Sequence, residues 1–196
     1  MEKVASKCYR PTTTLLLDQI RKNDGRFKVS FSITGTAIEQ MQAWAPDVID
    51  LLQQCAATGC ADFLAETSHH SLSSLYAPSE FKMQVEKHVS LMQELFDIEP
   101  IVFRNTELIY SDRIAKSVVD MNRFRGMTCE GVDRILGDRS PAWVYAPDGS
   151  GEHLPSAKIR LLLKNYRLSD DIAFRFSDQN WSEWPLDATR FAGWVD

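Results

Sequence analysis

No stretch of the sequence approaches the length of a membrane-spanning helix, and its first residues contain no apolar segment of the signal-peptide kind. No block of Lys or Arg occurs, and the net charge of −5 argues against nucleic acid and anionic membrane as partners. A Gly-rich phosphate-binding loop is also missing from the sequence. These absences fit a protein that acts on a neutral molecule.

Cysteine is scarce and does not form a metal-binding pattern. The four cysteines are Cys8, Cys55, Cys60 and Cys129, with no CxxC pair and no histidine at zinc spacing. We interpret them as small buried hydrophobes and expect neither a structural metal nor a cofactor. A reducing cytoplasm is the expected location.

Alternating strand and helix patterns run along the chain. Strands are predicted at 27–33, 60–65, 100–103, 126–129 and 159–163, and helices at 11–23, 38–52 (with a new start at Pro46), 81–96 and 114–121. This order predicts an α/β fold with a parallel sheet, either open and doubly wound or closed into a barrel. With no linker or repeat to divide it, we expect residues 1–196 to form a single domain.

Charged residues follow the predicted strands. In parallel α/β folds the strand ends carry the functional groups, so these residues are expected on one rim. The set is Glu66, His69, His70, Arg104, Glu107, Glu130, Asp133, Arg167, Asp170 and Asp171.

A rim with several carboxylates suits glycoside cleavage, which needs one ionised and one protonated carboxyl group. Arg104 lies three residues before Glu107 and could keep it ionised. Other interpretations stay open for single residues: a Glu after a strand is often a surface acid, and an Asp pair often caps a helix. The three tryptophans Trp181, Trp184 and Trp194 could pack together or stack on sugar rings. The residues alone therefore indicate an α/β domain with an acid-rich rim, consistent with a hydrolase.

Five segments together resemble the α-amylases of glycoside hydrolase family 57. They are FKVSFSITG (27–35), GCADFLAETSHHSLSSL (59–75), VFRNTELIY (102–110), TCEGVDRIL (128–136) and NYRLSDDIAFRFS (165–177). They occur in the family's order and span nearly the whole chain, which is more specific than any one motif.

The resemblance implies a (β/α)7 barrel and a retaining double displacement on α-1,4-glucans such as starch, glycogen or maltooligosaccharides, with no metal or cofactor. Glu107 matches the family's nucleophile. Asp171 is favoured as the acid/base, with Asp170 competing, and their carboxyls should lie roughly 5–5.5 Å apart. Substrate binding is expected of Glu66, His69, His70, Arg104, Glu130, Asp133, Arg167 and Asp170.

Two departures from the family pattern matter. The chain contains no His-Gln-Pro motif, which members carry on their first strand, and it stops before the last motif. We therefore expect an incomplete (β/α)7 barrel with unpaired edges and poor stability or activity for these 196 residues alone. The alternatives are a 4-α-glucanotransferase of the same family, a metal-dependent carbohydrate deacetylase using Glu66, His69 and His70, and a non-catalytic protein that binds glucan or a partner. The sequence does not indicate the oligomeric state.

Overall fold

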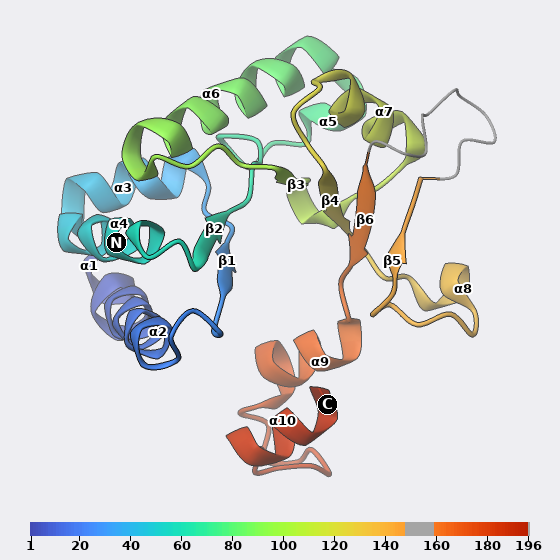
Figure 1. Ribbon diagram of the computed structural model, residues 1–196. Coiled ribbons are helices and arrows are strands. Elements are labelled where there is room, and N and C mark those ends of the chain that lie inside the picture. The colour runs from blue at the N-terminus through green and yellow to red at the C-terminus, as the bar shows by residue number, and fades with distance from the viewer. Residues whose placement is uncertain (148–158, 196) are drawn as a thin grey trace.

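The computed structural model describes residues 1–147 and 159–195 as a mixed α/β fold with parallel strands and helices (Figure 1). The strands are β1 (Val29–Phe31), β2 (Ala61–Phe63), β3 (Val102–Arg104), β4 (Gly126–Cys129), β5 (Val144–Tyr145) and β6 (Arg160–Leu163). The helices are α1 (Glu2–Val4), η1 (Ala5–Tyr9), α2 (Arg10–Lys22), α3 (Gly35–Trp44), α4 (Pro46–Ala57), α5 (Ser73–Tyr76), α6 (Pro78–Phe96), η2 (Thr106–Leu108), α7 (Asp112–Asp120), α8 (Asp133–Leu136), α9 (Tyr166–Asp170), η3 (Asp171–Arg175) and α10 (Ala188–Val195).

The strands form an open series. β1 pairs with β2, and β3 pairs with β4 and β4 with β6, all in parallel. One parallel bridge, Ala65 to Phe103, joins the end of β2 to β3. β5 pairs antiparallel with β6 at the far edge, and within the described residues β1 and β5 do not pair with each other. The prediction of an incomplete parallel β/α barrel is confirmed, whereas the antiparallel strand β5 was not predicted.

Local sequence signals set the helix boundaries. The Thr34 side chain accepts a hydrogen bond from the Ala37 N–H (3.1 Å) and caps α3. Proline opens both α4 and α6, at Pro46 and Pro78, where a missing N–H costs nothing. The predicted break at Pro46 is therefore confirmed.

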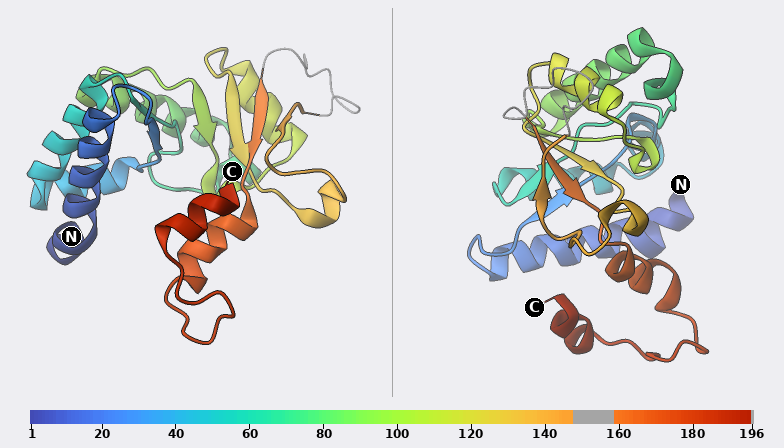
Figure 2. Two further views of the ribbon diagram at one scale, coloured as in Figure 1. Left: turned by 60° about the horizontal axis from the view of Figure 1, so that its bottom comes forward. Right: turned by 90° about the vertical axis from the view of Figure 1, so that its right-hand side faces the viewer.

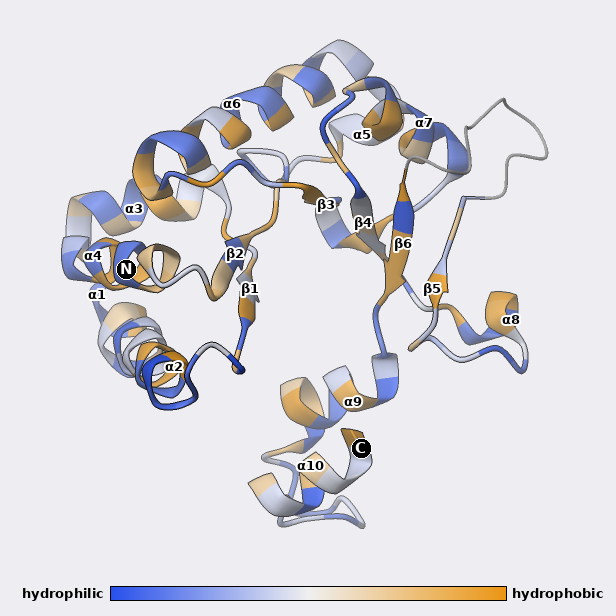
Figure 3. Cartoon of the chain, in the orientation of Figure 1, coloured by the Kyte–Doolittle hydropathy of each residue, from blue (hydrophilic) through white to orange (hydrophobic). Residues whose placement is uncertain are grey.

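Helices cover one face of the strands and form the core there. Phe103 on β3 is fully buried, and its ring lies 5.6 Å from that of Phe81 on α6, nearly edge-on. Phe63 on β2 stacks on Phe96 at 4.3 Å. Figure 3 shows the apolar side of α6 turned toward the strands. The apolar residues that recur at helical spacing along α6 are thus the residues that are buried against the sheet.

The opposite face of the strands is less covered and includes the polar side chains of Arg104 and Thr128. Because side chains alternate along a strand, Phe103 points to the helices and its neighbour Arg104 points away from them. The register sets Arg104 beside Thr128 and Thr128 beside Leu162, so the three lie in one row. Leu162 is 41% exposed, as expected for an uncovered face. This row leads directly to the strand ends where the charged residues follow.

The C-terminal helices extend away from the strands. After β6 the chain enters α9, η3 and α10, which lie together beyond the sheet (Figures 1 and 2). The Trp181 and Trp194 rings pack edge-on at 6.0 Å within this unit. Within the described residues, no helix combines the length and the apolar character needed to cross a membrane.

Candidate active site

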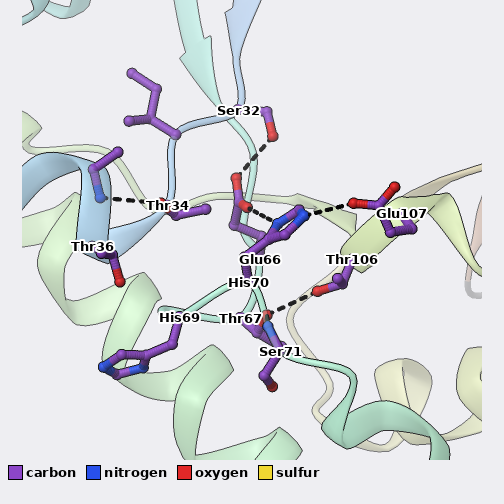
Figure 4. A network of polar contacts seen from close by, with 12 residues as sticks. Ser32, Thr34, Thr36, Glu66, Thr67, His69, His70, Ser71, Thr106 and Glu107 are labelled. Atoms are coloured by element: carbon purple, nitrogen blue, oxygen red, sulfur yellow. Dashed lines mark hydrogen bonds and ion pairs between the residues drawn. The ribbon is translucent and has the colours of Figure 1, made fainter.

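Glu66 anchors the cluster of polar side chains in Figure 4. It follows β2 and is only 2% exposed. Its Oε1 accepts a hydrogen bond from the Ser32 hydroxyl (2.8 Å), and its Oε2 lies 3.8 Å from Nδ1 of His70. A buried carboxylate needs such partners, and the ends of β1 and β2 supply them.

His70 connects Glu66 to Glu107. Its Nε2 lies 2.9 Å from Oε1 of Glu107, which is 70% exposed at the end of β3. The hydrogen bond from His70, its charge and the nearby Arg104 guanidinium lower the pKa of Glu107 below its usual value. The structure therefore places three predicted site residues in contact and favours the ionised form of Glu107.

The backbone at this contact is unusual. Glu107 and Leu108 have φ values of +54° and +56°, and His70 has +52°. The other non-glycine residues with positive φ in the described chain are Asp24, Asp97 and Asn122, types that tolerate this region, whereas Glu and Leu rarely do. Such conformations persist where the surroundings enforce them, often at functional sites.

A buried histidine that the sequence did not assign to the site holds the strand ends together. His88 on α6 is fully buried, and its Nε2–H donates to the Ile33 carbonyl (2.8 Å). Its Nδ1 accepts from the Glu66 N–H at 3.4 Å. Burial lowers the pKa of His88 below its usual value. The signal in the sequence was a histidine on the apolar face of a helix, between Val85 and Met92.

Glu130 and Asp133, which follow β4, have different surroundings. Glu130 is half-buried, and burial raises its pKa. Lys164 and Arg104 oppose that rise, whereas the Glu107 and Asp170 carboxylates add to it. Asp133 is exposed in the first turn of α8, where an acid stabilises the helix start.

Asp171 and Asp170 lie in different environments. Asp171 is 3% exposed, its Oδ1 accepts a hydrogen bond from Arg175 (2.6 Å), and it lines a pocket of about 500 Å³. The pocket is also lined by Arg167, Leu168, Trp181, Ser182, Glu183 and Trp194. Asp170 instead lies 3.8 Å from Nζ of Lys164. Both tryptophans therefore pack together and also face a pocket beside a carboxylate.

The histidines do not gather with Glu66 as a metal site. In Figure 4 the His69 side chain points away from Glu66 and His70. No group of three or more His, Cys, Asp or Glu side chains within residues 1–147 and 159–195 is placed to hold a metal ion. Within the described residues, Glu66, His69 and His70 therefore do not form the metal site that the deacetylase alternative requires.

Known proteins resemble this chain along its whole length. The family model Glycosyl hydrolase family 57 matches residues 1–196. A protein of Methanocaldococcus jannaschii described as "Putative alpha-amylase" is 45% identical over 195 residues. That match covers 98% of this chain and 39% of the relative, so the chain spans well under half of this relative's length.

Solved structures share the fold at low identity. The 4-alpha-glucanotransferase from Thermococcus litoralis has a TM-score of 0.72 and 18% identity, over 89% of this chain and 26% of that one. A GH57-type branching enzyme from Pyrococcus horikoshii has a TM-score of 0.58 and 10% identity, over 82% of this chain and 41% of that one. At these identities the likeness concerns the fold.

Proposed function

Because the chain belongs to glycosyl hydrolase family 57, we propose that it acts on α-1,4-glucans by a retaining double displacement. Glu107 attacks the anomeric carbon and forms a glycosyl ester, and Asp171 donates a proton to the leaving oxygen. Asp171 then takes a proton from the water or sugar hydroxyl that cleaves the ester. Hydrolysis and glucan transfer share this intermediate and differ only in the acceptor.

The contact between Glu107 and His70 carries the assignment of the nucleophile. A nucleophilic carboxylate must be ionised and held in place, and the 2.9 Å hydrogen bond does both. The left-handed backbone at Glu107 points to the same residue. Its 70% exposure leaves the carboxylate open to a sugar.

The pocket beside Asp171 supports this residue over Asp170 as the acid/base. Indole surfaces such as Trp181 and Trp194 present flat apolar faces on which sugar rings stack, and Arg167 adds hydrogen-bond donors. Asp170 is engaged by Lys164 outside this pocket's lining. A glucan is the proposed partner of the site.

Trapping of the covalent intermediate tests these roles. Fluoride leaves without protonation, so α-maltotriosyl fluoride should glycosylate Glu107 even in Asp171→Asn, which then hydrolyses the ester slowly. Peptide mass spectrometry should find a maltotriosyl group on Glu107 in Asp171→Asn and none in Glu107→Gln. Glu107→Gln should also lose at least about 10³-fold in release of reducing ends from soluble starch.

The matched control is Glu99→Gln, an exposed Glu just before β3, which should retain wild-type turnover. Labelling of a different residue, or turnover by Glu107→Gln at the wild-type rate, would show that Glu107 is not the nucleophile. Chain lengths of the products from maltotriose distinguish the two reactions, since transfer yields longer glucans and hydrolysis only shorter ones.

A further inference from the structure

Glu130 lies between the turn that follows β3 and the segment that follows β6. Its N–H donates to the Leu108 carbonyl in the turn after β3 (3.2 Å). On the other side the Lys164 N–H donates to the Cys129 carbonyl (2.9 Å). A Cβ on Gly131 would lie 2.3 Å from the Lys164 carbonyl oxygen, so only glycine allows the chain after β6 to pass this close. The backbone therefore fixes Glu130 between the turn of Glu107 and the segment leading to Asp170.

Charges of both signs surround the Glu130 carboxyl. Arg104 and Glu107 come from the β3 side, and Lys164 and Asp170 from the β6 side. The two cations lower the pKa of Glu130 and the two anions raise it. Further titratable neighbours are the adjacent Cys129 and the groups that line a shared pocket of about 460 Å³, namely Tyr110, Asp112, Arg139 and Tyr145.

One carboxyl oxygen of Glu130, Oε2, is buried without a hydrogen bond to any of the described residues. An ionised carboxylate with a buried, unpartnered oxygen costs more free energy than a protonated carboxyl group in the same place, because the charge is lost from water as well as the hydrogen bond. Glu66, by contrast, has a partner for each of its two oxygens.

We propose that Glu130 is a proton-holding positioning residue for Glu107: it keeps its proton while Glu107 is ionised, so that the pair carries one negative charge. This inference rests on the proposed role of Glu107 and assigns to Glu130 a part other than substrate binding. Loss of the Glu107 charge removes a repulsion, and Glu130 then ionises at lower pH and releases its proton to water.

Carbon-13 NMR of protein labelled at the glutamate carboxyl carbons measures both titrations without substrate. Glu107→Gln should lower the midpoint of Glu130 by about half a pH unit or more, the effect of one charge at about 10 Å with an effective dielectric constant of about 40. Glu130→Gln should leave the midpoint of Glu107 unchanged, because Glu107 titrates while Glu130 is still neutral. Glu99→Gln is the control and should move neither midpoint.

The inference is overturned if the Glu130 midpoint stays in place in Glu107→Gln, or if Glu130 ionises before Glu107 in the wild type. A role in packing alone would shift neither titration. If circular dichroism shows that Glu130→Gln does not fold, the Glu130 midpoint measured in Glu107→Gln still tests the inference. Should the titrations be coupled while Glu107→Gln retains turnover, the nucleophile assignment fails and the pairing of the two carboxyls stands.

Discussion

Acidification should destabilise the fold through His88. The ring is fully buried and both nitrogens are engaged, one as donor to the Ile33 carbonyl and one as acceptor from the Glu66 N–H. Protonation would remove the acceptor and bury a charge, and burial accordingly lowers the pKa of His88 from its ordinary value of 6.5. The hydrogen bond to the Ile33 carbonyl and the nearby Glu66 carboxylate oppose this shift but do not outweigh it.

Proton linkage gives the direction and the size of this change in the free energy of unfolding. Below pH 6.5 the unfolded chain binds a proton at His88 that the folded chain does not bind, so the free energy of unfolding falls as pH falls. The slope for one proton is at most about 1.4 kcal/mol per pH unit, and the loss ends once the pH passes the pKa of the folded state. Between pH 6.5 and 5 the loss therefore reaches at most about 2 kcal/mol, a sizeable part of a typical stability of about 5–15 kcal/mol.

Urea unfolding followed by circular dichroism between pH 5 and 7.5 measures this slope. The informative variant is His88→Gln, whose amide offers one donor and one acceptor but does not titrate. At pH 7.5 it should be less stable than wild type by about 1–3 kcal/mol, because its amide fits the two partners imperfectly. The difference in the free energy of unfolding between wild type and His88→Gln should narrow toward pH 5, because the wild type loses the stability that neutral His88 contributes. His69→Gln, at an exposed histidine, serves as the control and should run parallel to the wild type.

A gap between wild type and His88→Gln that stays constant from pH 7.5 to 5 would refute the reasoning. It would mean that His88 binds its proton equally in the folded and unfolded states. The range stops at pH 5 because Glu107 and Asp47 also have lowered pKa values. Their contributions are present at higher pH and are lost only as pH falls further.

Two further substitutions test the cluster around Glu66. His70→Gln removes the imidazole hydrogen bond and the charge that lower the pKa of Glu107, so the acid-side fall of kcat/KM on soluble starch should begin at higher pH. An unchanged pH profile would show that His70 does not set the pKa of Glu107. Ser32→Ala leaves Oε1 of the buried Glu66 carboxylate without its 2.8 Å donor and should lower the urea-derived stability by about 1–3 kcal/mol. Ser30→Ala, at an exposed serine on β1 two residues earlier, should change it by less than about 0.5 kcal/mol. Equal losses in the two serine variants would contradict the importance of that bond.

Much of the fold could be predicted because its parallel strands pack against helices, and this packing leaves a regular spacing of apolar residues in the sequence. Apolar spacing at 81–96 predicted α6, and the run 126–129 coincides with β4. Elements set by tertiary contacts could not be predicted in this way. β5 is only two residues long and exists through pairing with β6, and the π-helical turn of η3 has no signature in apolar spacing.

The candidate site was predictable as a set of residues rather than as contacts. Their positions at the predicted strand ends marked Glu66, His70 and Glu107 as candidates, and in the structure His70 contacts both glutamates. Sequence could not separate His69 from His70, because adjacent loop residues point in directions that only the backbone decides. His88 was missed because a histidine within an apolar helix face is usually part of the core.

The exposure of Glu107 explains why the buried residues behind it matter. A carboxylate that is 70% exposed would ordinarily sample several rotamers and keep an ordinary pKa. Here its partner His70 also approaches Glu66, which is 2% exposed and fixed by Ser32 and, through its backbone, by His88. Rigidity thus passes from the core to an exposed oxygen through a short series of polar contacts. Enlarging the space around His88 should therefore loosen the position of the Glu107 carboxylate, even though the two residues do not share a hydrogen bond.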